Sequence, residues 1–169
     1  MLREAVEQAS RRQDVRDSVA RIYANLQTEI EARRPNCEMS GRCCRFDEFG
    51  HRLYVTTIEL ASFVANLQEP NGEAKGFSPG SCPFQSNGLC TVHPIRPFGC
   101  RIFFCDQTAT DWQHAQYERF HAQIKRLHEE LNVPYVYMEW RAALRVLQLI
   151  PEPAEAPPTS ALSLPQLHL

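Results

Sequence analysis

The sequence predicts a small, mainly α-helical domain with a loop-rich middle that is organised by cysteines. Three observations predict this fold class. Apolar residues recur at three- and four-residue steps near both ends of the chain. All seven cysteines lie between residues 37 and 105. The same window is rich in turn-forming pairs such as Ser40-Gly41 and Asn87-Gly88, which interrupt regular structure.

The 169 residues suit one domain with a sizeable core. We divide the chain into an N-terminal helix (1–36), a cysteine-cluster region (37–110), a C-terminal helix pair of the same domain (111–150) and a disordered Pro-rich tail (151–169). The net charge is −2, so the chain lacks the excess of basic residues that is typical of proteins that bind nucleic acids or acidic membranes. No export signal or membrane-spanning run is evident, so we expect a cytoplasmic protein without nucleic-acid or membrane partners.

The first predicted helix covers residues 3–34, and Pro35 ends it. Its apolar face consists of Val6, Ala9, Val15, Val19, Ile22, Leu26 and Ile30. Within the cysteine window, a short helix is expected over TIELASFVANLQ, capped by Thr56 or Thr57 with Glu59 in its first turn. Residues 51–55 fit either a short strand or an extended segment.

Two further helices are predicted after the window. Asp111 is the expected N-cap of the first, which Asn132 and Pro134 interrupt. The second covers residues 135–150, and Pro151 stops it. We expect the aromatic residues of this region to build the core; they are Trp112, Tyr135, Tyr137 and Trp140. The tail 151–169 has no periodic apolar face and is predicted to be disordered.

Three chemical explanations compete for the clustered thiols: disulfides, catalytic thiols and metal ligation. The odd number of cysteines and the lack of an export signal argue against disulfides. The chain also lacks the CxxC pair of redox enzymes. Metal ligation is therefore the leading interpretation, and the candidate ligands are Cys37, Cys43, Cys44, Cys82, Cys90, Cys100 and Cys105.

The spacing of the cysteines favours an iron-sulfur cluster, of the 4Fe-4S type, over zinc. Zinc knuckles use closely spaced cysteine pairs, and only Cys100 and Cys105 approach that spacing. A four-iron cluster accepts thiolates from more widely separated loops. Because neighbouring side chains diverge in extended backbone, we do not expect Cys43 and Cys44 to ligate the same iron; one binds while the other packs or serves a second site. The expected main site is then Cys37, Cys43 or Cys44, Cys90 and Cys100, with Cys82 and Cys105 ranking next.

The motifs CEMSGRCC, CPF and CTVHPIRPFGCRIF together resemble the YkgJ-like cysteine-cluster family, also described as the CxxCxxCC or zinc- or iron-chelating domain. The resemblance covers about residues 37–104. It implies metal or cluster binding and supplies no reaction. Flagellin lysine methylases carry a similar cysteine region. The matching positions are Cys37, Cys43, Cys44, Cys82, Cys90 and Cys100, together with Arg96, Pro97 and Arg101 of the RPxxCR signature.

One departure from the family pattern is Ser40, which stands where the second cysteine would be. Cys105 lies just beyond the motif and is a candidate replacement. His93 is a candidate nitrogen ligand or hydrogen-bond partner of a sulfur. Arg96 and Arg101 are expected to flank the thiolates, where cations lower thiol pKa values and offset cluster charge. A zinc-binding structural or interaction module and a cluster-dependent modifying enzyme remain the alternatives, and the sequence names neither a catalytic residue nor a protein partner.

Overall fold

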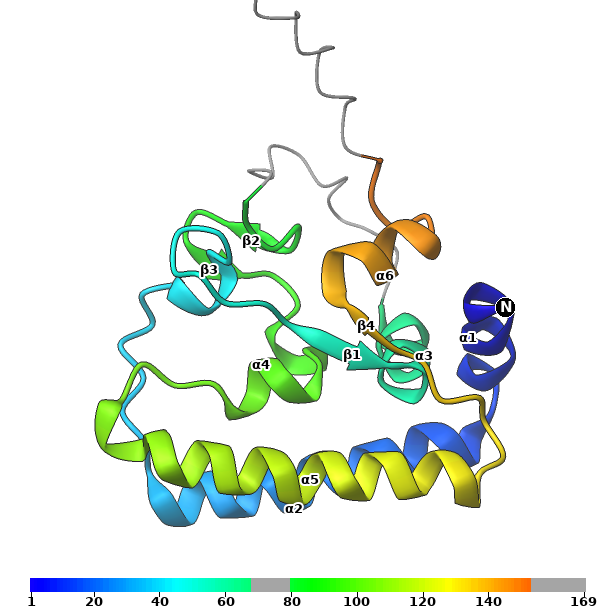
Figure 1. The fold of residues 1–169 in the computed structure, drawn as a ribbon, viewed down its shortest axis with the longest axis horizontal. Coiled ribbons are helices and arrows are strands. Elements are labelled where there is room, and N and C mark those ends of the chain that lie inside the picture. Colours follow the sequence, from blue (N-terminus) through cyan, green and yellow to red (C-terminus); the bar gives the residue numbers. More distant parts are fainter. Residues whose placement is uncertain (68–79, 153–169) are drawn as a thin grey trace, which may run out of the picture.

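The computed structural model describes residues 1–67 and 80–152, and over these residues the predicted mainly α-helical class is confirmed. Two long helices, α2 (Gln13–Arg33) and α5 (Thr110–Glu130), lie side by side and form the base of the molecule (Figure 1). The other elements stack on one face of this pair. The predicted disordered tail falls almost entirely on residues 153–169, outside the described residues.

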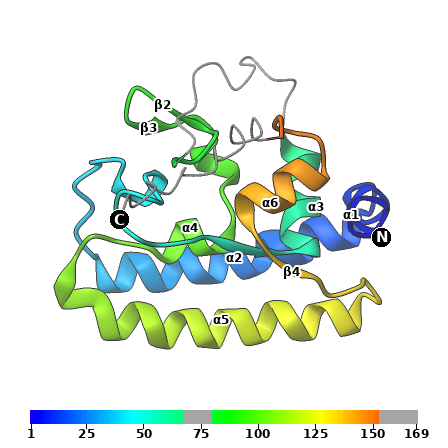
Figure 2. The ribbon, with the colours of Figure 1, turned by 45° about the horizontal axis from the view of Figure 1, so that its top comes forward.

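The elements above the base form two groups. One group lies at the end nearest the N-terminus and consists of α1 (Leu2–Ser10), α3 (Thr57–Asn66) and α6 (Trp140–Val146). The other lies at the opposite end and includes η1 (Arg42–Cys44) and the hairpin β2 (Gln85–Ser86) and β3 (Leu89–Cys90) (Figure 2). The chain then passes through η2 (His93–Ile95), α4 (Phe98–Ile102) and η3 (Gln107–Ala109) into α5. The cysteine window therefore packs over the base instead of standing apart from it.

The single N-terminal helix predicted over residues 1–36 is wrong, because the chain forms two helices there. Arg12 leaves the helical conformation, with φ −85° and ψ 122°, and α1 turns to pack against α3. The apolar pattern carries a sign of this break, since Ala9 and Val15 are six residues apart instead of three or four. The predicted end of the helix before Pro35 is confirmed, since α2 ends at Arg33.

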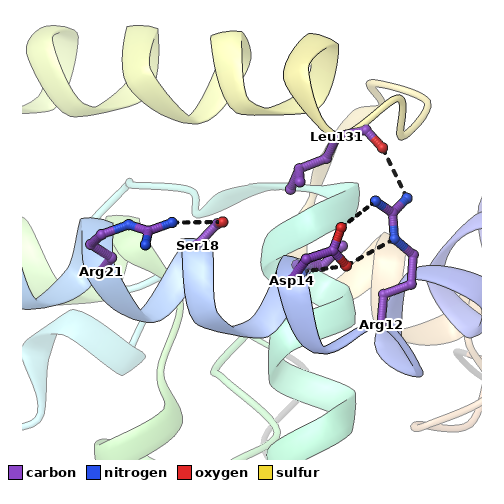
Figure 3. Close-up of polar contacts among 6 residues, drawn as sticks. Arg12, Asp14, Ser18, Arg21 and Leu131 are labelled. Carbon is purple, nitrogen blue, oxygen red and sulfur yellow. Dashed lines mark hydrogen bonds and ion pairs between the residues drawn. The ribbon is translucent and has the colours of Figure 1, made fainter.

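The junction between α1 and α2 is held to the far end of α5 by one arginine. The guanidinium of Arg12 donates a hydrogen bond of 2.9 Å to the carbonyl oxygen of Leu131 and pairs with Asp14 at 2.7 Å (Figure 3). Asp14 also accepts the backbone N–H of Val15, which places a carboxylate in the first turn of α2. The break in the N-terminal helix thus has its own polar partners.

A two-stranded antiparallel sheet links the middle of the chain to its C-terminal part. β1 (Tyr54–Thr56) pairs with β4 (Tyr137–Glu139), in a register that sets Val55 opposite Met138. The segment predicted as strand or extended is therefore a strand at its end. The helix predicted over 135–150 is wrong in its first part, because residues 137–139 are extended and α6 covers only Trp140–Val146. Val55 is fully buried, and pairing with β4 satisfies the backbone groups beside it.

The predicted cap of the short helix is confirmed, and it does more than start α3. One carboxylate oxygen of Glu59 accepts hydrogen bonds from the backbone N–H (2.9 Å) and the hydroxyl (2.8 Å) of Thr56. The other oxygen accepts the backbone N–H of Phe98 at 3.1 Å. Glu59 therefore joins the start of α3 to the start of α4. Burial raises the pKa of this carboxyl.

Replacing Glu59 with alanine is expected to lower the free energy of unfolding by about 2–4 kcal/mol, because two buried N–H donors lose their acceptor. Urea denaturation followed by circular dichroism measures the loss. The matched control is Glu7→Ala, which removes an exposed ion pair to Arg3 and is expected to cost less than about 1 kcal/mol. Equal losses in the two variants would contradict the structural role of Glu59.

The expectation that four C-terminal aromatic residues build the core holds only in part. Trp140 is 1% exposed and packs edge-on against Phe63, with ring centroids 5.0 Å apart. Trp112 is partly buried, whereas Tyr135 and Tyr137 are 39% and 40% exposed. Tyr137 is the first residue of β4 and Tyr135 precedes that strand, and both side chains lie at the surface with their rings stacked. In the part of the chain that the structure describes, no helix has both the length and the hydropathy needed to cross a membrane.

Candidate metal centre

The two cysteine-bearing segments converge despite their separation in sequence. The backbone N–H of Cys82 donates to the carbonyl oxygen of Cys44 at 2.7 Å. On either side of this bond, Asp47 N–H donates to Gly80 O at 2.9 Å, and the side-chain amide of Gln85 donates to Gly41 O at 3.0 Å. This convergence is what a single site built from both segments requires.

Two glycines allow the segments to approach this closely. Gly41 has φ +69°, and a Cβ atom at that position would lie 2.1 Å from the carbonyl oxygen of Gly88. Gly88 itself occupies the β2–β3 turn with φ +78°, directly after Asn87 with φ 50°. An Asn-Gly pair with two positive φ angles is the preferred two-residue hairpin turn. The predicted turn at Asn87-Gly88 is thus confirmed, and it places Cys90 beside η1.

The thiol of Cys44 lies at the centre of a cluster. Its pKa is raised because its single S–H can donate a hydrogen bond to a neighbouring thiolate, that of Cys43, Cys82 or Cys90, and because it is buried. Cys44 and Cys82 are 6% and 5% exposed, whereas Cys43 and Cys90 are half-buried. Four sulfurs contributed by η1, the segment before β2, and β3 therefore share one small volume.

Cys100, from α4, lies close to this group. The residue is partly exposed, but its thiol is tightly surrounded, and burial raises its pKa well above the ordinary value. The charges of Cys82, Cys90 and Cys43 raise it further. We refer to these five residues, Cys43, Cys44, Cys82, Cys90 and Cys100, as the thiol cluster.

Three members of the thiol cluster are poised to lose their protons. Hydrogen bonding to Cys44 lowers the pKa of Cys43 to about 6 and that of Cys90 to about 7, against the opposing effect of burial. The pKa of Cys82 is lowered by the same partner. The backbone N–H groups of Phe84 and Val92 contribute at Cys82 and Cys90, respectively. Because Cys44 has one proton to donate, it stabilises one of these three as the thiolate, the form that binds metals, whereas Cys44 and Cys100 favour the thiol.

The guanidinium of Arg96 acts on three thiols of the cluster. Its positive charge lowers the pKa values of Cys43 and Cys90 and opposes the rise at Cys100. The Nε–H of Arg96 is buried and has no hydrogen-bond partner among the described residues. The expected role of Arg96 as a cation beside the thiols agrees with this placement.

A second buried donor borders the cluster. The Nε1–H of Trp140, at the start of α6, also lacks a partner at hydrogen-bond distance within residues 1–67 and 80–152. It nevertheless lies close enough to the Cys82 sulfur to lower the pKa of that thiol. Buried donors are usually satisfied, and the sulfur of Cys82 is the acceptor within reach of this indole N–H.

Arg101 acts on the backbone that carries Arg96. It donates to the carbonyl oxygens of Arg96 (2.9 Å) and Pro94 (2.7 Å), and its guanidinium lies 4.3 Å from the ring centroid of Tyr23 on α2. Burial is the main cause that lowers the pKa of Arg101. The side chain therefore positions the turn from η2 to α4 on the base of the molecule.

Two of the seven cysteines lie apart from the thiol cluster. Cys37 is exposed in the segment between α2 and η1, and Cys105 is half-buried between α4 and η3. The main groups that shift the pKa values of the five clustered thiols include neither of them. The sequence ranked Cys37 above Cys82 as a candidate ligand. In the structure, Cys82 belongs to the thiol cluster and Cys37 does not.

The remaining sequence-predicted positions are peripheral or differ in backbone. Ser40 and His93 are exposed, and burial followed by the charge of Arg96 lowers the pKa of His93. The premise that Cys43 and Cys44 lie in extended backbone is wrong, because η1 is a 3₁₀ turn. Such a turn rotates successive side chains by about 120° instead of sending them to opposite faces. Both thiols can therefore face the same small volume.

Metal ligation itself stays a prediction. Within the described ranges, no group of three or more Cys, His, Asp or Glu side chains has the arrangement of a formed metal site. Comparisons of the chain with protein-family models, with curated proteins and with solved structures find no match. The family resemblance therefore continues to depend on the motifs alone.

Replacing Arg96 with glutamine in the metal-free protein is expected to raise the pKa values of Cys43 and Cys90 by about one unit, because a nearby positive charge that favours the thiolate is lost. The rate of iodoacetamide alkylation as a function of pH, resolved for each cysteine by mass spectrometry, measures the shift toward higher pH. The control is Arg42→Gln, which removes an exposed arginine of η1, the element that contains Cys43. Identical alkylation profiles for both variants would show that Arg96 does not act on the thiols.

Proposed function

We propose that this protein binds an iron-sulfur cluster, of the 4Fe-4S type, through the thiol cluster. The observation that carries the proposal is the joint placement of five thiols with the guanidinium of Arg96, whose Nε–H is buried, and the indole N–H of Trp140. A four-iron cluster needs four thiolates, and its potential is tuned by hydrogen bonds to sulfur. The thiol cluster contains enough sulfurs for the four ligands, and the indole N–H of Trp140 is a donor beside the Cys82 sulfur.

The chemistry of the donor set fits such a group. The lowered pKa values of Cys43, Cys82 and Cys90 favour thiolates, and the guanidinium of Arg96 compensates part of the negative charge that four thiolates would concentrate. The indole N–H of Trp140 is available to a sulfur at the Cys82 position. One of the five thiols is then left over as a neighbour that packs against the site.

Zinc is the second candidate, and one observation favours it. The thiol of Cys44 lies within hydrogen-bond reach of three other thiols, which is a compact arrangement of four sulfurs. Tetrahedral zinc holds each sulfur at about 2.3 Å, so four sulfurs around one ion lie near contact. A larger iron-sulfur cluster would require these side chains to spread. A zinc site of this kind would serve a structural or interaction module.

Anaerobic purification with analysis of iron, zinc and acid-labile sulfide separates the two candidates. A 4Fe-4S protein contains about four irons and four sulfides per chain and is brown, whereas a zinc protein contains about one zinc, no sulfide and no visible absorption. Reconstitution with iron and sulfide, and separately with zinc, tests the metal-free protein. Absence of both metals after purification and after reconstitution would refute metal binding by the thiol cluster.

A further inference from the structure

A cavity of about 340 Å³ adjoins the thiol cluster. Two of the clustered cysteines, Cys43 and Cys100, belong to its wall. The rest of the lining comes from the segment that leads into β1, from the end of α4 and from the start of α5. Small-molecule sites in proteins occupy about 300–1,000 Å³, so this cavity has room for one small ligand beside two of the sulfurs.

Flat aromatic side chains form much of the wall. The ring of His51 stacks on Phe103, with centroids 5.2 Å apart and planes inclined by 15°, and meets the edge of Phe46 at 5.4 Å. Tyr117 lines the cavity from α5. Aromatic rings bind other rings by stacked and edge-to-face contacts. The shape and composition of the cavity therefore suit a planar ring.

The charge of the lining is one-sided. Among the described residues that line the cavity there is the guanidinium of Arg52 and no Asp or Glu side chain. Arg52 is exposed and has no ion-pair partner within the described parts of the chain. A guanidinium is well suited to carboxylate, sulfonate and phosphate groups. An anionic group on the ligand would therefore meet Arg52.

His51 connects the aromatic wall to the cysteine segment. Its Nε2 atom lies 3.3 Å from the backbone oxygen of Cys43, within hydrogen-bond distance. A ring inserted against Phe103 and His51 would thus lie over the same segment that presents the Cys43 sulfur. Occupation of the cavity is expected to shield that sulfur from solvent.

We propose that this cavity binds a small planar aromatic acid, with its ring against Phe103 and His51 and its anionic group at Arg52. The proposal of a binding site depends only on the position of the cavity and on the residues that line it. That the ligand lies next to a metal centre rests on the proposed function. The combination assigns a substrate or effector class, aromatic acids, to the site.

The test compares two probes that differ in charge, naphthalene-1-sulfonate and 1-naphthalenemethanol, on the metal-free full-length chain by calorimetry. The sulfonate is expected to bind up to about fivefold more tightly than the alcohol, as one exposed charge pair of about 1 kcal/mol allows. Arg52→Gln should bring the affinity for the sulfonate to that for the alcohol. Arg42→Gln, a neighbouring exposed arginine outside the cavity, should change neither affinity.

A second variant tests the aromatic wall. Phe103 is 41% exposed, so the Phe103→Ala variant is expected to remain folded. It is expected to lower the affinity for each of the two probes about tenfold. Naphthalene-1-sulfonate should also slow iodoacetamide alkylation of Cys43 and leave that of Cys37 unchanged. Lack of binding by both probes, or affinities that neither Arg52→Gln nor Phe103→Ala alters, would overturn the proposal.

The outcome is separable from that of the proposed function. Metal analysis does not depend on the probes, and probe binding is measured on metal-free protein. If the chain binds metal but neither probe, the aromatic-acid site is refuted and metal binding stands. If the probes bind as expected but reconstitution fails, the aromatic-acid site stands and the metal centre is refuted.

Discussion

The Cys44→Ser variant is expected to retain less than about one-tenth of the metal bound by the unaltered protein, since even outer-sphere changes at metal sites cost about 10- to 100-fold in affinity. Cys44 is the thiol that faces three of the other clustered thiols, and it is 6% exposed. Serine places a hydroxyl, which stays protonated and binds soft metals poorly, at this central position.

The matched control is Cys37→Ser, because Cys37 is exposed and stands apart from the thiol cluster. This variant is expected to retain its metal within experimental error. Metal per chain is measured after anaerobic purification, and far-UV circular dichroism verifies that both variants keep their helices. Cys90→Ser, which alters a half-buried member of the cluster, provides a second variant if Cys44→Ser does not fold. If Cys37→Ser loses the metal and the two cluster variants keep it, the proposed ligand set is wrong.

Removal of the metal is expected to increase hydrogen exchange by about a hundredfold or more in residues 41–53 and 80–100, and much less in α2 and α5. A structural metal contributes directly to the stability of the segments that ligate it. Both segments contain short irregular stretches, and the backbone bonds between Cys44 and Cys82 and between Asp47 and Gly80 hold them together. The long helices bury an apolar face of their own and do not depend on the thiols.

Exchange monitored by mass spectrometry before chelation, after chelation and after metal is restored measures this effect. Peptides from α2 and α5 in the same samples serve as internal controls. Recovery of protection after reloading separates loss of the metal from irreversible damage. Unchanged exchange in residues 41–53 and 80–100 after complete metal removal would show that the metal contributes nothing to their stability.

The parts of the fold that the sequence predicted depend on local interactions. The pair Thr56 and Glu59 forms a cap within four residues, so its pattern is visible in the chain. Pro35 likewise ends α2 through its own geometry. The strand β4 is different, because its partner β1 lies about eighty residues earlier. Periodicity over 135–150 could not reveal that residues 137–139 pair with a distant strand.

For the site as well, the features that could be predicted are local in sequence, and those that could not depend on contacts between distant segments. The clustering of cysteines marked the window from which five thiols converge, and the motif placed Arg96 near them, where its charge acts on Cys43. The higher rank of Cys37 over Cys82 could not be corrected from spacing. That choice depends on the close approach of Gly41 to Gly88, which brings the hairpin onto η1. The sequence could not predict that the indole N–H of Trp140 lies beside Cys82 either, because the two residues are far apart in the chain.

The position of Trp140 in the chain has a consequence for the order in which the centre is completed. Synthesis proceeds from the N-terminus, and all five clustered thiols precede Trp140, which follows Cys100 by forty residues. Until α6 docks, its indole does not cover Cys82, which the finished fold leaves only 5% exposed. A chain whose α6 has not yet docked therefore exposes Cys82 more than the finished protein does, whereas Cys43, Cys90 and Cys100 are partly exposed in the finished fold as well. If the proposed metal centre forms, we expect the docking of α6 to be the step that covers Cys82.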